Sequence, residues 1–343
     1  MNIIKDIGLE VNMEFKKLDK KYLEACVNIA AEQYIKEYEK VEELYSKNYK
    51  EEIFKSMEYI FENDNGIVAF EEQKLAGYLA FGKIFGKASE GTKYIASPLC
   101  GYGINSCFDR GKISSLLFQH ASEQLCKKGV GNYEVTLYAH DIDVIASYVL
   151  NNFGILCTSE IRRVDSLEVP ELKGKYTYVE LSVEEIDRNK DALLKLWREL
   201  VEHLRRSPTY YPGEEFTDDA FLEYIHDKGT RFFAAKHHEN IVGMIDISKD
   251  GNNFITRQEG IMNVGDLYLK PEFRGQDIAK ELLMHVNRTL KNEGIERLWV
   301  EHGTTNPTAQ GFWGKYFTKF TYTLTRKIDE KLLGGWKEEQ KNL

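Results

Sequence analysis

A regular stripe of hydrophobic residues marks the second half of the chain. Four apolar side chains recur at steps of four over 278–290, and Gly294 follows where a helix C′ glycine is expected. The pattern predicts an amphipathic helix whose stripe packs on a sheet. Apolar stretches at 261–271 and 296–302 predict strands before and after it, so the three segments predict a parallel crossover. The stripe consists of Ile278, Leu282, Val286 and Leu290.

The same order of predicted elements occurs twice along the chain. A strand–turn–strand pattern spans 66–82 and again 231–248. An arginine–glycine pair opens a predicted helix at Arg110 and again at Arg274, and each half ends in a matching predicted strand. The spacing between matching features stays near about 165 residues, which indicates an internal repeat.

The length of the chain agrees with the repeat. At ~100 to 200 residues per domain, 343 residues favour two domains. Pro170 and Gly174 interrupt both periodicities within 164–177. We therefore predict one domain over 1–168 and a second over 169–343.

Charge and cysteine usage exclude several classes of protein. Lys and Arg total 46 against 55 Asp and Glu, and the net charge of −9 disfavours a nucleic-acid partner. The sequence has no run of ~18 apolar residues and no signal-like start, so we expect a cytoplasmic protein without a membrane partner. Five cysteines without a C-x-x-C motif predict reduced thiols, with neither a disulfide framework nor a zinc site.

The segment 274–279 has the features of an anion-binding turn. It follows a predicted strand and opens the predicted helix, whose first backbone N–H groups lack intrahelical partners. Gly275 permits close approach of a ligand to the backbone, Arg274 supplies a positive charge, and the helix dipole adds ~0.5 of a charge. Arginine and glycine also occur at helix starts for capping and solubility, so both interpretations stay open at this point.

With the preceding LYLKP and the later NPTAQGFW, this turn resembles the signature of the GNAT N-acetyltransferase superfamily, R/Q-x-x-G-x-G/A after a strand. Arg274 and Ala279 match the signature, and Asp277 stands where it has glycine. The resemblance covers most of 175–330 and, through the repeat, 13–165 more weakly. It implies a layered α/β (α+β) fold of two tandem GNAT-like domains. Each would be a mixed, mostly antiparallel sheet with flanking helices and a central parallel pair at the cofactor cleft.

The resemblance also implies acetyl-CoA as the co-substrate, without a metal. Its pantetheine would hydrogen bond to the backbone of Leu267 and Leu269 like an added strand, and its pyrophosphate would lie at the turn. Asp277 would then place a carboxylate near the phosphates, although an acidic residue in the first helical turn also suits the helix dipole. The cofactor-binding residues expected in the turn are Arg274, Gly275, Gln276, Asp277, Ile278 and Ala279.

A short helix is predicted to begin at Asn306 and Pro307, with Asn as N-cap and Pro at the first helical position. The resemblance implies that this Asn also reaches the cofactor. One helical turn later the family often has a Tyr that protonates the departing thiolate, and Trp313 stands there instead. Because Trp cannot act as that acid, we expect Trp313 to contact the cofactor and Tyr316 to be the acid.

Transfer to an amine also requires a base, since an ammonium group has a pKa of ~10. Asp266 and Glu301 are the leading candidates, because they lie on neighbouring predicted strands near the expected cleft. Glu259 and His302 are the alternatives.

The first half has a shorter turn, with RGKI where the second half has RGQDI. Removing a residue changes the direction of successive N–H groups, so we expect this turn not to bind phosphate. Asp141 or Asp143 stands where the second half has Asn306, and a carboxylate there would repel phosphate. The first half is therefore predicted to be a degenerate, structural partner in an intramolecular pseudo-dimer.

These observations predict an acetyl-CoA-dependent N-acetyltransferase with one active site, in the C-terminal half, where a primary amine attacks directly in a ternary complex. The acceptor is expected to be a small-molecule or peptide amine. A non-catalytic acyl-CoA-binding or interaction protein on the same scaffold is the alternative, because of Asp277 and Trp313. Four residues of 197–216 would suit a cationic acceptor, although a solvated loop explains them equally well. They are Tyr210, Tyr211, Glu214 and Glu215.

Overall fold

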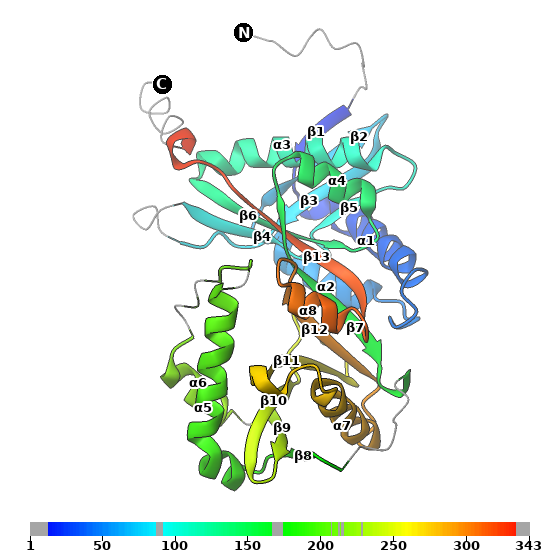
Figure 1. The fold of residues 1–343 in the computed structure, drawn as a ribbon. Helices are drawn as coiled ribbons and strands as arrows, with labels where there is room; N and C mark the ends of the chain where they lie inside the picture. Colours follow the sequence, from blue (N-terminus) through cyan, green and yellow to red (C-terminus); the bar gives the residue numbers. More distant parts are fainter. Residues whose placement is uncertain are drawn as a thin grey trace. The chain divides into compact units, whose positions relative to one another are not determined.

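The computed structural model describes residues 13–86, 92–166 and 174–333, apart from 207, 212, 214, 215 and 228. Both halves contain the predicted elements in the predicted order (Figure 1). The helices are α1 (Leu23–Tyr38), α2 (Lys50–Phe61), α3 (Arg110–Lys127), α4 (Ile142–Leu150), α5 (Val183–Arg206), α6 (Asp218–Tyr224), α7 (Ile278–Asn292) and α8 (Pro307–Trp313). The strands are β1 (Met13–Lys17), β2 (Asn65–Glu71), β3 (Lys74–Phe81), β4 (Lys93–Ser97), β5 (Tyr102–Ile104), β6 (Val130–Tyr138), β7 (Gly154–Arg163), β8 (Thr177–Glu180), β9 (Arg231–His237), β10 (Asn240–Ser248), β11 (Ile261–Leu269), β12 (Arg297–Gly303) and β13 (Thr318–Lys327).

Two compact units form, and each contains the final strand of the other half of the sequence. Strand β7 ends the first half and pairs antiparallel with β12 from Cys157 to Arg163. Strand β13 ends the second half and pairs antiparallel with β6 from Thr321 to Lys327. The linear division at residue 168 therefore does not follow the compact units. Unit 1 consists of the described residues of Met1–Lys40, Ser46–Leu156 and Thr321–Leu343, and unit 2 of those of Val41–Tyr45 and Cys157–Phe320.

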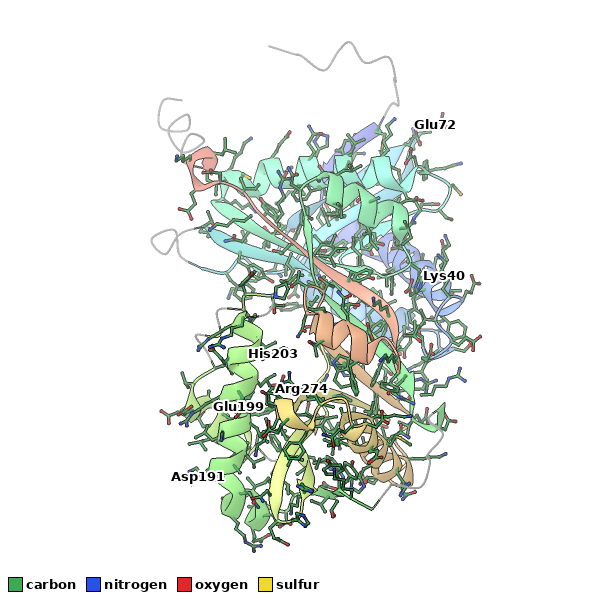
Figure 2. The ribbon with its side chains drawn as sticks, in the orientation of Figure 1. Lys40, Glu72, Asp191, Glu199, His203 and Arg274 are labelled. Carbon is green, nitrogen blue, oxygen red and sulfur yellow. The ribbon has the colours of Figure 1, made fainter. Side chains whose placement is uncertain are left out.

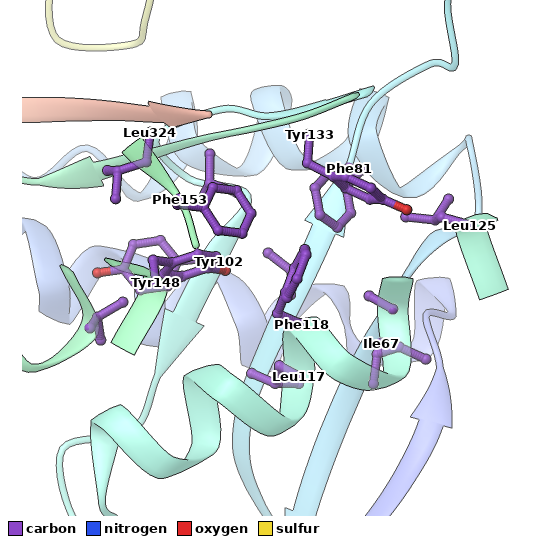
Figure 3. Close-up of a cluster of buried hydrophobic side chains, with 14 of the residues drawn as sticks. Ile67, Phe81, Tyr102, Leu117, Phe118, Leu125, Tyr133, Tyr148, Phe153 and Leu324 are labelled. Atoms are coloured by element: carbon purple, nitrogen blue, oxygen red, sulfur yellow. The ribbon is translucent and has the colours of Figure 1, made fainter. Parts of the chain in front are cut away.

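Unit 1 packs its strands and helices around an aromatic core. Its strands pair in the orders β1-β2-β3-β5 and β4-β6-β13. Phe118 of α3 meets Phe153 edge to face, with ring centroids 4.9 Å apart, and Tyr148 packs against Phe153 at the same distance. Leu324 from the exchanged strand β13 is fully buried in this cluster (Figure 3). The exchanged strand thus supplies part of the core that holds unit 1 together.

Unit 2 is a sheet of order β7-β12-β11-β10-β9-β8 with helices on both faces. The predicted apolar stripe of α7 is buried on one face, with its four residues at most 1% exposed. Helices α5 and α6 cover the opposite face through a second apolar cluster. Strands β11 and β12 are parallel, as predicted, and Gly294 ends α7 with φ of 82°. Within the described ranges, no helix combines the length and apolarity needed to cross a bilayer.

The internal repeat is visible at the paired glycines. Gly243 of β10 lies opposite Leu269 of β11, and a Cβ there would come within 2.0 Å of the Leu269 side chain and 2.9 Å of the Tyr268 carbonyl oxygen. Gly77 lies at the matching place in unit 1, and a Cβ there would come within 2.8 Å of the Gly103 carbonyl oxygen. Both positions need glycine because the neighbouring strand approaches closely.

Candidate functional site

The two central strands of unit 2 separate along their length. The parallel pairing of β11 with β12 runs from Ile261 and Arg297 to Val264 and Val300, and then stops. Strand β11 continues to Leu269 and stays paired with β10, across a register shift that places Gly265 and Asp266 opposite the single residue Asp246. This β-bulge turns β11 away from β12, so the edge of β11 that carries Leu267 and Leu269 is open to a ligand.

The turn between β11 and α7 has a backbone that only some residues accept. Gly275 has φ of 73°, and its missing Cβ would point into open space. Asp277 has φ of 62° and is the N-cap of α7, but its side chain makes no capping hydrogen bond. The prediction that Asp277 lies within the first helical turn is therefore wrong, because α7 begins at Ile278. The left-handed conformation gives a physical reason for glycine in the family signature, and Asp is one of the few other residues that adopt it.

A cavity of about 390 Å³ joins this turn to helix α8. Ten residues expected at the site from the sequence line it. They are Leu267, Leu269, Arg274, Gly275, Asp277, Ile278, Ala279, Asn306, Trp313 and Tyr316. Gln276, Asp266 and Glu301 are not among its lining residues; the Gln276 side chain instead accepts from Tyr176 Oη at 2.7 Å and donates to the Glu272 carbonyl.

The remaining lining residues were not expected from the sequence. They are Leu200, His203, Tyr268, Lys280, Thr308, Ala309, Phe312 and Lys315. Lys280 could have been inferred from helical spacing, since it lies in the first turn of α7, whereas Lys315 lies in the turn after α8. Leu200 and His203 come from α5, about 70 residues away in sequence, and Figure 2 shows His203 and Glu199 on this helix beside Arg274. Leu200 and His203 both lie within 197–216, the segment that the resemblance associates with the acceptor, but no local pattern places α5 beside the turn.

Helix α8 closes the cavity and has the predicted N-cap. The Asn306 side chain accepts hydrogen bonds from the N–H groups of Thr308 and Ala309 at 3.1 and 3.2 Å, and Pro307 is the first helical residue. Trp313 is 5% exposed and packs against Phe317 in the core, so most of its surface serves packing. Tyr316 is half-buried, and burial followed by the charge of Asp277 raises its pKa above the usual range.

The Arg274 side chain is exposed, but two contacts fix its position. Its Nε donates to the Leu269 carbonyl oxygen at 3.1 Å, and its guanidinium lies 5.1 Å from the centre of the Tyr268 ring. The positive charge is therefore held at the mouth of the cavity. His203 lies close enough that burial and this charge lower its pKa.

Asp266 stands beside a second carboxylate that the sequence pattern did not reveal. Asp246 on β10 is 2% exposed, and its Oδ1 accepts from the Asp266 backbone N–H at 2.8 Å. Its Oδ2 accepts from the Tyr224 hydroxyl at 2.7 Å. Burial, followed by the neighbouring carboxylate of Asp266, raises the pKa of Asp246, and burial raises the pKa of Asp266. Both carboxyl groups therefore titrate above the usual range for Asp.

Glu301 and His302 lie on opposite faces of β12. The Glu301 carboxylate accepts from Ser159 Oγ and Asn252 Nδ2, each at 3.1 Å, and burial raises its pKa while these donors oppose the shift. His302 is buried, and its Nε2 lies 3.2 Å from Oε1 of the fully buried Glu160. Among the described residues, no group of three or more acidic, histidine or cysteine side chains could hold a metal ion.

The matching turn of unit 1 is closed by its own side chains. Helix α3 begins at Arg110, so the arginine and glycine lie inside the first helical turn, and Asp109 caps it by accepting from the Lys112 N–H at 3.0 Å. Arg110 donates to Asp141 and to the Ile104 carbonyl oxygen. Tyr102 also donates to Asp141. The charge that corresponds to Arg274 is thus neutralised within unit 1.

The structure describes most of the segment 197–216, which contains the four residues considered for the acceptor. Tyr210 and Tyr211 are exposed, at 74% and 39%. Glu214 and Glu215 lie outside the described residues.

Comparisons with known proteins agree with this geometry. Residues 197–317 match the Acetyltransferase (GNAT) family model, and every residue that lines the cavity lies within this segment. Within this segment the chain is similar to the GNAT family. A comparison with curated proteins gave no match.

Two solved structures share the fold over nearly the whole chain. One is a GCN5-related N-acetyltransferase from Sphaerobacter thermophilus, with a TM-score of 0.57 and 12% identity over 93% of this chain and 96% of that one. The other is the GCN5-related glucosamine N-acetyltransferase region of a fungal multi-domain GH3 beta-N-acetylglucosaminidase, with a TM-score of 0.51 and 13% identity over 93% and 38%. At these identities the likeness establishes the fold, and the predicted mixed α/β architecture is confirmed.

Proposed function

We propose that this chain is an acetyl-CoA-dependent N-acetyltransferase with a single active site in unit 2. The observation that carries the proposal is the cavity of about 390 Å³, which lies inside the GNAT segment. It joins the open edge of β11 to an N-terminus of α7 that no side chain caps. An extended thioester with a phosphate-rich end matches both parts of such a cavity.

The residues present fit acetyl-CoA. The turn leaves the first N–H groups of α7 available, and Gly275 leaves open space where a Cβ would stand. Arg274, Lys280 and Lys315 line the same cavity and would attract the phosphates. When bound, acetyl-CoA supplies an acetyl group activated as a thioester, and the backbone of Leu267 and Leu269 would hold its pantetheine.

Two side chains of this chain would move protons. The Asp266 carboxylate would take one proton from the ammonium group of the acceptor, which leaves a neutral amine able to attack the thioester carbon. The Tyr316 hydroxyl would give a proton to the CoA sulfur as the carbon–sulfur bond breaks. Its raised pKa keeps the hydroxyl protonated at neutral pH, as an acid requires. Glu301 is the second candidate base, on the neighbouring strand.

Acetyl-CoA titration followed by an assay of free CoA thiol tests the proposal. Tight binding together with CoA release that depends on an added amine, and a product heavier by one acetyl group, is the expected result. Tight binding without turnover on any amine of a broad panel would favour the alternative, a non-catalytic acyl-CoA-binding protein. Asp277 in the cavity and the buried Trp313 in place of a tyrosine motivate that alternative.

A further inference from the structure

At the β-bulge of unit 2, two aspartates from neighbouring strands lie beside each other. Asp246 accepts from the backbone N–H of Asp266, so the buried carboxylate holds the residue that we propose as the base. The Tyr224 hydroxyl, from α6, holds the other oxygen of Asp246. Both oxygens of Asp246 therefore accept hydrogen bonds from donors, while Asp266 is half-buried.

Gly265 makes this arrangement possible. A Cβ at Gly265 would lie 1.9 Å from Oδ2 and 2.8 Å from Cγ of Asp246. The Asp246 carboxylate thus occupies the space that any other residue at 265 would need. At the bulge that separates β11 from β12, Gly265 and Asp266 lie opposite the buried Asp246.

The side chains of Asp246 and Asp266 lie on the face of the sheet opposite α7. Leu267 packs with α7, and Met244 and Tyr268 pack with α5 and α6, so Asp246 and Asp266 lie on the α5–α6 side. This is the side from which an acceptor can approach the thioester without displacing α7.

The charged groups around the pair do not neutralise it. Helix α6 contributes Tyr224, β12 contributes Glu301 on the same face, and β9 places the uncharged Phe232 opposite Asp246. A second cavity next to Tyr268 is lined by charged and titratable residues of both signs, which are Lys195, Arg198, Glu199, Glu202, His203, Arg206, Glu272 and Arg274. Neither aspartate forms an ion pair with any basic side chain in the part of the chain that the structure describes.

We propose that Asp246 and Asp266 form an electrostatically coupled pair of carboxyl groups, in which Asp246 is a positioning residue and Asp266 is the base that meets the acceptor amine. The inference rests on the proposed function and adds the group that tunes its base. The buried carboxylate of Asp246, which accepts from the Asp266 backbone N–H, disfavours a second negative charge on Asp266. Asp266 therefore accepts the ammonium proton more readily than an isolated Asp, and releases it to solvent after the acetyl group has left CoA.

The pH dependence of kcat/KM for the acceptor tests the role of Asp246. Asp246→Asn keeps the size of the side chain and an oxygen acceptor but removes the charge, so Asp266 should lose its proton at lower pH. We expect the acidic limb of the profile to move by at least half a pH unit toward acid, with KM for acetyl-CoA unchanged. Asp250→Asn is the control, since it removes an exposed carboxylate four residues further on that accepts from Ser248, and the limb should stay in place. An unmoved limb in Asp246→Asn would overturn the proposal.

A reciprocal measurement does not depend on activity. In Asp266→Asn, carbon-13 NMR should show the Asp246 carboxyl titrating at lower pH than in the parent, because coupling between two sites acts equally in both directions. An unchanged titration would overturn the pair even if Asp246→Asn failed to fold. Asp266→Asn also separates the two proposals: full turnover in this variant would remove Asp266 as the base of the proposed function, and the NMR titration would then decide the pair alone.

Discussion

Replacing Asp277 by Asn separates the effect of charge from that of backbone conformation in the turn that we propose binds phosphate. Asp277 lines the cavity as the N-cap of α7, with φ of 62° and no capping bond from its side chain. Asn adopts the left-handed conformation as readily as Asp and ranks equally as an N-cap. The free energy of unfolding should therefore change by less than ~0.5 kcal/mol, while one negative charge leaves the cavity.

The size of the effect on acetyl-CoA affinity follows from electrostatics. Two like charges ~7 Å apart in water repel by ~0.6 kcal/mol, and a pyrophosphate presents two of them. Removing the carboxylate should therefore strengthen binding by ~1 kcal/mol, which is about five-fold in Kd. The gain should shrink as salt is raised from 0.05 to about 0.5 M, because the turn is exposed and ions screen the repulsion.

Titration calorimetry with acetyl-CoA at both salt concentrations measures this prediction. Asp277→Gly is the companion variant, since it removes the charge and also the left-handed strain. It should bind at least as tightly as Asp277→Asn. An affinity in Asp277→Asn equal to or weaker than that of the parent would refute the reasoning, because the carboxylate would then not face the phosphates.

Three further changes test separate parts of the account. Arg274→Ala should weaken acetyl-CoA binding by ~1.5 to 3 kcal/mol in calorimetry, whereas Arg110→Ala should leave it unchanged; equal affinity in all three proteins would contradict the site assignment. Tyr316→Phe should lower kcat by ~10² in the thiol assay with little change in KM, and a fall of less than threefold would leave protonation of the thiolate to water. Gly265→Ala should lower the free energy of unfolding by ~1 to 3 kcal/mol in urea, and adding Asp246→Ala should restore part of it; without that rescue, the close contact would not be the cause.

Local patterns predicted the elements that local physics determines. The apolar stripe of α7, the glycine that ends it and the Asn306 cap of α8 all follow from helical spacing and termini. The position of the turn at 274–279, which we propose binds phosphate, was predictable for the same reason, since it depends on consecutive residues.

Features that depend on register or topology could not be read from the sequence. The contact between Asp246 and Asp266 arises from a bulge, which shifts pairing by one residue without any hydrophobic signal. The exchange of β7 and β13 was hidden because a strand has the same alternating pattern whichever sheet it joins. The left-handed backbone of Asp277 was missed because Asp is also common in a first helical turn.

A crystal structure of the protein grown with CoA tests the central claim most directly. The account predicts one CoA molecule per chain, with its pyrophosphate at the backbone of residues 275–279 and its pantetheine along Leu267 and Leu269. It also predicts no CoA at the start of α3. There, Asp109 accepts from the Lys112 N–H and Asp141 accepts from the Arg110 guanidinium. CoA bound at Arg110, or outside the cavity that Arg274 and Asn306 line, would contradict the account.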